Sequence, residues 1–149
     1  FIVERAKKLK IPMVFTSKPE LENFDDLEKI LAKHKVDYII LAGFLLKIPS
    51  KMIEQYPNKI INIHPALLPK YGGKGMYGEN IYKAVLENKE TESGISVHFV
   101  NQNYDEGKII FQKSFSLSPD ENLKSLTAKI HELEQSLFPK IIEKTLFSL

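Results

Sequence analysis

The chain has 149 residues, of which 43% are hydrophobic and 27% are charged, and its formal net charge at pH 7 is +2. These values predict a single globular domain over residues 1–149, long enough to bury a core. The lysines are spread along the chain, so they do not form the concentrated basic stripe of a nucleic-acid-binding protein. No cysteine occurs, which excludes disulfides, thiolate metal sites and cysteine nucleophiles.

The hydropathy pattern argues against a membrane protein. No apolar stretch approaches the roughly 18 residues that a membrane-spanning helix needs, and no signal peptide precedes the first predicted helix. We therefore expect a cytoplasmic protein that binds neither membranes nor nucleic acids. The segment that begins at Phe1 resembles the middle of a helix, whereas a parallel α/β domain normally opens with a strand. We expect that an upstream segment is missing.

The first half of the chain alternates predicted helices and strands. A near-continuous apolar, β-branched run over 36–43 is typical of a central parallel strand covered on both faces. A short helix over 50–56 and a strand over 59–64 follow it. The elements predicted before this run are a helix over 2–9, a strand over 12–15, and a helix whose apolar stripe contains Phe24, Leu27, Ile30 and Leu31.

In the second half, a glycine-rich segment over 65–78 predicts a mobile loop. A helix over 80–88 precedes two strands, 93–100 and 108–115, that predict an antiparallel hairpin. A long helix begins at Pro119, and Pro139 is expected to kink or split it. The predicted fold class is α/β, with a mostly parallel sheet flanked by helices, a C-terminal antiparallel hairpin and a long last helix.

Two polar residues stand out in the strand over 59–64. On a strand the side-chain period is two, so Asn62 and His64 share one face while Ile61 and Ile63 share the other. Pro65 ends the ladder and leaves His64 at the strand tip, where open α/β sheets bind ligands. Taken singly, each residue is more typical of a structural hydrogen bond, but together they predict a cleft lined by an amide and an imidazole.

The predicted hairpin contributes a carboxylate. Asp105 lies at its tip, where a plain turn aspartate is the alternative, and His98 is interpreted as a structural residue within the strand. An amide, an imidazole and a carboxylate together suit the stabilisation of an oxyanion and the transfer of a proton. No serine stands in an activated context, and no spacing of His, Asp or Glu matches a metal site. The sequence therefore favours direct group transfer to a substrate amine.

Three segments carry a resemblance to a known family. The run INIHPALLPKYGG, the run SGISVHFVNQNYDEGKII and the segment KIHELEQSLFP resemble the phosphoribosylglycinamide formyltransferases of the folate-dependent formyltransferase superfamily. The resemblance covers essentially all 149 residues. It implies a Rossmann-like formyltransferase fold and transfer of a formyl group from 10-formyltetrahydrofolate to the amine of glycinamide ribonucleotide in purine biosynthesis, with no metal.

The resemblance also implies site residues. Asn62 would bind the formyl oxygen, His64 would donate a proton, and Asp105 would raise the pKa of His64. His131 and Glu134 would contact glycinamide ribonucleotide, and Glu134 lies at the edge of the apolar stripe of its helix. The residues implied to bind folate are Leu45, Leu46, Lys47 and Ile48, for which core packing is the alternative, together with Asn62, Asn101, Gln102, Asn103, Tyr104 and Asp105.

The chain departs from the family at several points. The family opens with a strand and a glycine-rich phosphate loop, and we expect both to be missing here, so that these residues alone would be weak or inactive. The loop GGKGMYG differs from the version in many relatives, and no arginine stands near Lys18 to Glu20 to match the family's folate-contacting arginine. Folate contacts in that region are therefore not predicted.

Three alternatives stay open. Formyltetrahydrofolate deformylase would use water as the formyl acceptor, and methionyl-tRNA formyltransferase would carry a larger, more basic second domain. From another class, the chain could be a non-catalytic folate-binding fragment, in which replacing His64 would leave ligand binding unchanged. A homodimer is compatible with the sequence, because the edge of an incomplete parallel sheet would expose unpaired backbone groups.

Overall fold

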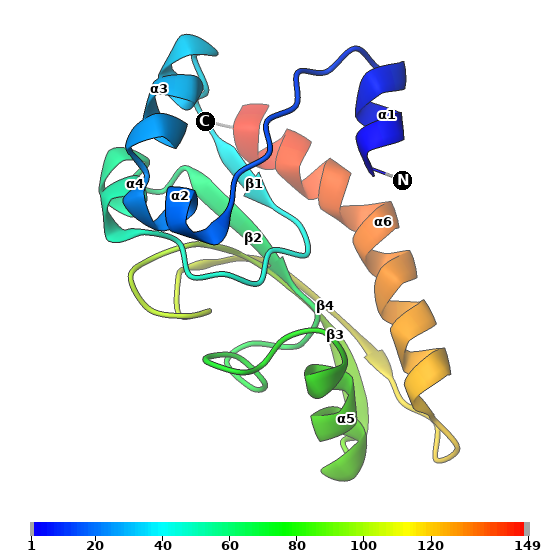
Figure 1. Cartoon of the computed structure of the whole chain (residues 1–149). Coiled ribbons are helices and arrows are strands. Elements are labelled where there is room, and N and C mark those ends of the chain that lie inside the picture. The colour runs from blue at the N-terminus through cyan, green and yellow to red at the C-terminus, as the bar shows by residue number, and fades with distance from the viewer. Residues whose placement is uncertain (1, 148–149) are drawn as a thin grey trace. The chain divides into compact units, whose positions relative to one another are not determined.

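The computed structural model describes residues 2–147, and it divides into two compact units, Phe1–Val36 and Asp37–Leu149 (Figure 1). The single domain expected over 1–149 stays a prediction. The first unit holds the first three helices of Figure 1, and the second holds every strand of the described residues. All predicted site residues lie in the second unit.

The first unit is helical and differs from the prediction in two places. Its helices are α1 (Ile2–Lys8), α2 (Lys18–Asn23) and α3 (Asp25–Lys33). The strand predicted over 12–15 is wrong: those residues are exposed and pair with no other strand of the described chain. The single helix predicted around Phe24 is broken there, because Phe24 takes a left-handed conformation with φ of 61°.

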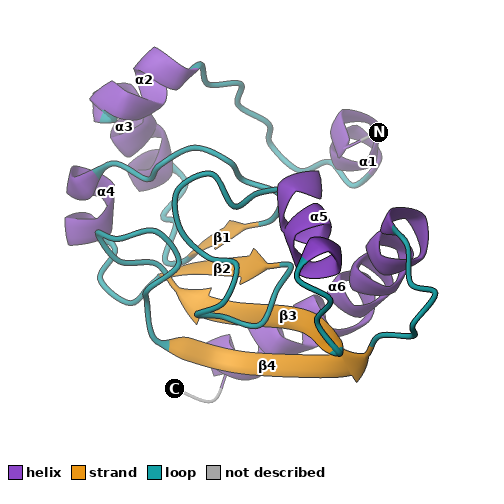
Figure 2. Ribbon diagram, turned by 90° about the horizontal axis from the view of Figure 1, so that it is seen from below, coloured by secondary structure: helices purple, strands orange, loops and turns teal. Residues whose placement is uncertain are grey.

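The second unit is an α/β structure built on one four-stranded sheet, which confirms the predicted fold class (Figure 2). The strand order is β1-β2-β3-β4; β1 and β2 are parallel, and the other two pairings are antiparallel. The elements are β1 (Ile39–Leu41), α4 (Ser50–Gln55), β2 (Ile60–His64), α5 (Glu79–Glu87), β3 (Glu92–Phe99), β4 (Ile109–Ser116) and α6 (Leu123–Phe147).

Two details of the predicted sheet are wrong. Strand β1 has three residues and lies at the end of the described sheet, whereas a longer central strand was expected over 36–43. The expectation of mostly parallel pairing also fails for the described residues, because the predicted β3–β4 hairpin adds to β2 in the antiparallel direction. Antiparallel pairing of consecutive strands needs only a short connection, which the chain supplies between β3 and β4.

Helix α6 runs without interruption from Leu123 to Phe147, so Pro139, which was expected to kink or split the helix, does not split it. A proline inside a helix removes one hydrogen bond and crowds the preceding turn. Here Phe138 is buried on one side of the proline, and Ile141 and Ile142 pack against the same core on the other. Tertiary packing therefore outweighs the local cost. No helix among residues 2–147 is long and apolar enough to cross a membrane.

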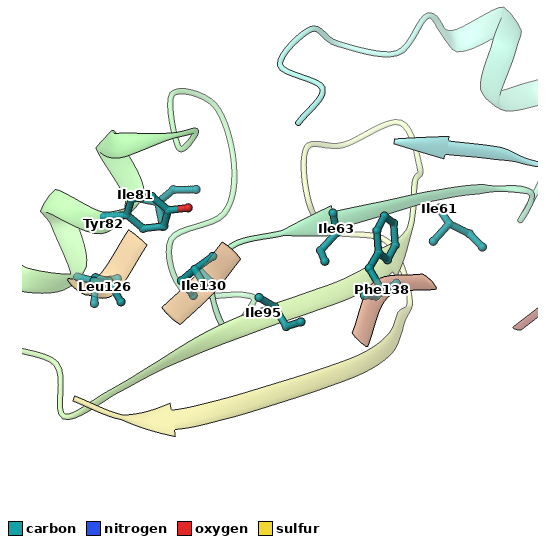
Figure 3. Packing of buried hydrophobic residues seen from close by; sticks show 11 residues of the cluster. Ile61, Ile63, Ile81, Tyr82, Ile95, Leu126, Ile130 and Phe138 are labelled. Carbon is teal, nitrogen blue, oxygen red and sulfur yellow. The ribbon is translucent and has the colours of Figure 1, made fainter. Parts of the chain in front are cut away.

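The core lies on the face of the sheet that α5 and α6 cover. Alternate residues of β2 and β3 point into it, and Figure 3 shows Ile61, Ile63 and Ile95 beside side chains from both helices. Each of these isoleucines is at most 7% exposed. The helices contribute Ile81, Tyr82 and Val85 from α5 and Leu126, Ile130 and Phe138 from α6.

The opposite face of the same two strands is polar. Asn62 lies opposite His98 in the β2–β3 register, and His64 lies opposite Ser96. Because the side-chain period of a strand is two, these four residues share one face while their neighbours fill the core. The predicted alternation in β2 is thus confirmed, and the register places the polar groups of two strands side by side.

Candidate functional site

His64 is the last residue of β2, and its side chain is held by the loop that follows. Its Nε2 atom lies 2.7 Å from the backbone carbonyl oxygen of Tyr71. A carbonyl oxygen can only accept a hydrogen bond, so Nε2 carries a proton whether the ring is neutral or charged. Nδ1 is therefore the nitrogen that gains and loses the exchangeable proton.

Asp105 faces that second nitrogen from the connection between β3 and β4. Its Oδ1 atom lies 3.7 Å from Nδ1 of His64 and 3.6 Å from Nε2 of His98. Its Oδ2 atom accepts a hydrogen bond of 2.9 Å from the backbone N–H of Gly73. The φ of Asp105 is 57°, a left-handed conformation that aspartate tolerates better than most residues. The alternative of a plain turn aspartate does not describe these contacts.

Two glycines allow the loops to approach this carboxylate. A Cβ atom at Gly72 would lie 2.6 Å from Cδ2 of Leu68 and 3.2 Å from Cβ of Asp105. A Cβ atom at Gly107 would lie 1.6 Å from the backbone oxygen of Phe99. At Gly107 the close atom belongs to the backbone, so only glycine fits there, whereas at Gly72 the nearest atom is the end of the Leu68 side chain. Gly107 thus allows the β3–β4 connection that carries Asp105 to approach the backbone of Phe99.

Asn62 is oriented by a residue that the sequence did not assign to the site. Its Nδ2 atom lies 3.1 Å from Nε2 of His98, and Nδ1 of His98 lies 2.9 Å from the backbone oxygen of Phe99. That carbonyl only accepts, so Nδ1 carries a proton, and Nε2 accepts from the amide of Asn62 when it carries no proton. The second N–H of the amide stays available. His98 is 2% exposed, as a structural residue would be, yet it fixes the Asn62 amide.

The environment shifts the pKa values of the imidazole and the carboxylate in the same direction. Burial lowers the pKa of His64, although the charge of Asp105 and the carbonyl of Tyr71 oppose this shift. Burial alone would raise the pKa of Asp105, but contacts with His98, the Gly73 N–H and His64 hold it below its usual value. Asp105 does act to raise the pKa of His64 as predicted, while the net shift of His64 is downward because burial dominates.

Ser96 holds the loop that follows His64. Its buried hydroxyl donates to the carbonyl of Ala66 at 2.6 Å and accepts from the N–H of Leu68 at 3.0 Å. It also lies 2.8 Å from Nε2 of Gln112, which donates to the carbonyl of Leu68 at 2.9 Å. The serine therefore ties the start of the loop to β3 and β4. The sequence alone did not indicate this role, because it depends on contacts between distant segments.

A cavity of about 390 Å³ opens at this end of the sheet, and every predicted site residue lines it. Leu45 and Leu46 are 60% and 39% exposed, so core packing does not account for them, whereas Ile48 is 5% exposed. Tyr77 and Met76 of the glycine-rich loop also line the cavity. The predicted residues in its lining are Leu45, Leu46, Lys47, Ile48, Asn62, His64, Asn101, Gln102, Asn103, Tyr104, Asp105, His131 and Glu134.

Two contacts join the walls of this cavity. The hydroxyl of Ser50, at the start of α4, donates to Oε1 of Gln102 at 2.8 Å. The ammonium of Lys47 lies 5.7 Å from the centre of the Tyr104 ring, within the range of a cation–π interaction. The segment after β1 and the β3–β4 connection thus contact each other and line the same cavity.

Helix α6 contributes the far wall. Glu134 is half-buried, and burial raises its pKa, with the charge of His131 opposing the shift. Tyr82 of α5 has its pKa raised to about 12 by burial and by the charge of Glu134. His131 is exposed, and the half-buried position of Glu134 agrees with its predicted place at the edge of the apolar stripe. Among residues 2–147, no group of three or more His, Cys, Asp or Glu residues could hold a metal ion.

Comparisons with known proteins show the family to which this chain belongs. The formyl transferase family profile matches residues 2–142. The chain is 37% identical over 144 residues to the chloroplastic phosphoribosylglycinamide formyltransferase of Arabidopsis thaliana, covering 93% of this chain and 49% of the relative. It is 36% identical over 143 residues to the phosphoribosylglycinamide formyltransferase of Haemophilus influenzae, covering 93% and 65% respectively.

Solved structures have a similar fold. The crystal structure of phosphoribosylglycinamide formyltransferase from Bacillus halodurans matches with a TM-score of 0.85 and 28% identity, covering 98% of this chain and 75% of that one. A formyltetrahydrofolate deformylase from Pseudomonas syringae has a TM-score of 0.84 at 20% identity over 97% of this chain and 48% of that one. The second likeness shows the fold alone.

Proposed function

We propose that this chain, which belongs to the formyl transferase family, transfers a formyl group from 10-formyltetrahydrofolate to the amine of glycinamide ribonucleotide in purine biosynthesis. The similarity to phosphoribosylglycinamide formyltransferases from Arabidopsis thaliana and Haemophilus influenzae supports this acceptor. The chain spans about half the length of the Arabidopsis relative. Some relatives are chloroplastic, so the cytoplasmic location stays a prediction, as does a homodimer.

The observation that carries the proposal is the meeting of an amide, an imidazole and a carboxylate at one cavity. The N–H of Asn62 that is not bonded to His98 can donate to an oxygen in the cavity. Nδ1 of His64 can exchange a proton there, and Asp105 faces that nitrogen. A tetrahedral adduct at a formyl carbon develops negative charge on its oxygen, which these donors stabilise.

The proposed reaction needs no group beyond the two substrates. The acceptor amine attacks the formyl carbon, and the carbonyl oxygen becomes an oxyanion beside Asn62. Collapse of the adduct reforms the carbonyl and breaks the bond to N10 of the folate. The proton lost by the amine nitrogen ends on N10, and Nδ1 of His64 is the ring nitrogen free to carry it. Asp105 stabilises the imidazolium while the proton is on the ring.

The cavity offers separate surfaces for the two substrates in this proposal. Folate would lie against Leu45, Leu46, Lys47 and Ile48 and the segment from Asn101 to Asp105. Glycinamide ribonucleotide would approach from the side of His131 and Glu134. An apolar wall with a few polar groups suits a pterin ring, and a carboxylate suits ribose hydroxyls.

The test is the consumption of 10-formyltetrahydrofolate with and without glycinamide ribonucleotide. Because the chain matches 65% of the Haemophilus influenzae relative, the assay uses both the 149-residue chain and a chimera in which it replaces the matching part of that relative. Asp105→Asn, which keeps the side-chain shape and removes the charge, serves as the matched control. We expect consumption that requires the acceptor and is strongly reduced in the control.

The other outcomes separate the alternatives. Equal consumption with and without the acceptor, with formate as product, would identify a deformylase. A third outcome is tight binding of folate that neither the 149-residue chain nor the chimera consumes. If Asp105→Asn also leaves that binding unchanged, the result would contradict catalysis and favour a folate-binding role.

A further inference from the structure

The segment 71–73 holds both members of the His64–Asp105 pair. The carbonyl of Tyr71 accepts from Nε2 of His64 at 2.7 Å, and the N–H of Gly73 donates to Oδ2 of Asp105 at 2.9 Å. Both contacts are made by backbone groups, two residues apart. A displacement of this short segment would therefore change the orientation of the imidazole and of the carboxylate together.

The side chain of Tyr71 anchors this segment outside the cavity. Its hydroxyl donates to Oε1 of Glu90 at 2.9 Å, and Glu90 follows the end of α5. Lys70 supports the carboxylate from the same loop, with Nζ at 2.9 Å and 3.2 Å from its two oxygens. Hydrogen bonds to charged groups are among the stronger ones in proteins. Neither Tyr71 nor Glu90 lines the cavity.

The backbone at this point needs an external constraint. Tyr71 has φ of 57°, a left-handed conformation that is uncommon for an aromatic residue. Gly72 and Gly73 follow it, and glycine has the widest conformational freedom of any residue. A segment of this composition is not held in place by its own local preferences. The contact between Tyr71 and Glu90 supplies a fixed point immediately before the glycines.

We propose that Tyr71 and Glu90 are positioning residues for catalysis, which hold segment 71–73 so that Nδ1 of His64 faces Asp105 and the substrates. This inference deepens the proposed function, since it assigns residues outside the cavity to the same reaction. It requires that loss of the hydroxyl–carboxylate contact alters the imidazole of His64, although neither side chain touches that ring.

The test reads the His64 ring directly, by ¹⁵N NMR of the 149-residue chain, with the signal identified by its loss in His64→Ala. In the wild type we expect the neutral ring to be protonated at Nε2. In Tyr71→Phe and in Glu90→Ala we expect a mixture of tautomers and titration at a lower pH, because the carbonyl of Tyr71 favours the charged ring. Glu90→Gln keeps an oxygen acceptor for the tyrosine hydroxyl and should restore the wild-type spectrum.

Activity of the chimera gives the second reading. We expect Tyr71→Phe and Glu90→Ala each to lower kcat about tenfold, below the roughly hundredfold loss that a 1 Å misplacement can cause. The KM for folate should change little. Glu90→Ala also removes the pair with Lys70, but both substitutions remove the hydroxyl–carboxylate contact, so the double variant should lose no more than Glu90→Ala alone. Glu79→Ala, which removes the 3.1 Å surface ion pair with Lys83 on α5, is the matched control and should have no effect.

An unchanged tautomer and titration of His64 in both folded variants would overturn the inference. Additive losses of kcat in the double variant would overturn it as well. If Tyr71→Phe does not fold, the comparison of Glu90→Ala with Glu90→Gln by the same NMR measurement tests the inference. The NMR reading needs no substrate, so failure of formyl transfer by the wild type would count against the proposed function and not against this positioning role.

Discussion

The two faces of the sheet in the second unit come from alternate residues of the same strands, but different forces organise them. On one face, Ile61, Ile63 and Ile95 pack against α5 and α6, and their contribution follows the apolar area that they bury. On the other face, His64 and His98 are equally buried, but each is held by specific partners. Burial of a polar group is costly without such partners.

Neighbouring residues of one strand therefore have different roles: those on the core face stabilise the fold, and those on the polar face are proposed to serve the reaction. A core residue can be exchanged for another of similar size at modest cost, because packing is not directional. A residue of the polar face cannot, because its role depends on which atom donates and which accepts. Substitutions on the two faces should therefore have different signatures, and this provides a way to test the comparison.

The largest effect on stability is expected from Phe138→Ala in α6. Phe138 is 7% exposed within the core, and loss of such a ring typically costs about 3–5 kcal/mol. Urea unfolding should show this loss, while transfer per folded molecule stays unchanged. Phe147→Ala is the matched control, since Phe147 is 83% exposed in the same helix and should cost less than about 0.5 kcal/mol. Equal losses in the two variants would contradict the assigned core.

Asn62→Ala should have the largest effect on the reaction among the polar-face substitutions outside the imidazole. Loss of one donor to a developing oxyanion reduces kcat by about 10²–10³-fold, or about 2.7–4 kcal/mol in the barrier. Asn62→Asp, which keeps the size and removes the N–H donors, should be as slow. Steady-state kinetics with both substrates would measure this. A change confined to KM would show that Asn62 only binds the ground state.

Ser96→Ala tests whether the polar face also contributes to stability. The hydroxyl of Ser96 bonds Ala66, Leu68 and Gln112, so its loss leaves buried groups unpaired at a cost of about 1–3 kcal/mol. Thermal or urea unfolding would measure the loss. Ser114→Ala, at an exposed position of β4, should change stability by less than about 0.5 kcal/mol. If the two serines behaved alike, the hydroxyl would not hold the loop.

The smallest effect concerns pH. Burial keeps the pKa of His64 below its ordinary value of 6.5, so below that pH the unfolded chain binds a proton that the folded chain does not. The free energy of unfolding should therefore fall as the pH falls from 6.5 towards the folded-state pKa of His64. Above pH 6.5 this group should cause no loss of stability. Unfolding free energies measured across this range should change less in His64→Gln. A steeper decline in that variant would contradict a buried neutral imidazole.

The same two faces explain how much the sequence could predict. The alternation of Ile61, Asn62, Ile63 and His64 was sufficient to place β2 and its polar face, because the strand period follows directly from backbone geometry. Helix α5 and the β3–β4 hairpin were also predicted, since their periodicity and turn residues are local signals. Pro65 correctly indicated that His64 would end its strand.

What the sequence could not predict depends on contacts between distant segments. The pairing of His98 with Asn62 follows from strand register, and the contact of Tyr71 with His64 follows from the path of a loop. The uninterrupted α6 depends on packing on both sides of Pro139, which outweighs the local preference of proline. The strand predicted over 12–15 failed because a strand requires a partner, which composition alone does not supply.

The most direct test is a paired measurement of transfer rate and unfolding free energy in two single variants, His64→Ala on the polar face and Ile95→Ala on the core face. The account predicts that His64→Ala slows transfer by about 10²–10⁴-fold while the chain stays folded. It predicts that Ile95→Ala costs about 2–5 kcal/mol of stability while each folded molecule keeps its transfer rate. Loss of transfer in proportion to loss of stability in both variants would contradict the division between the two faces.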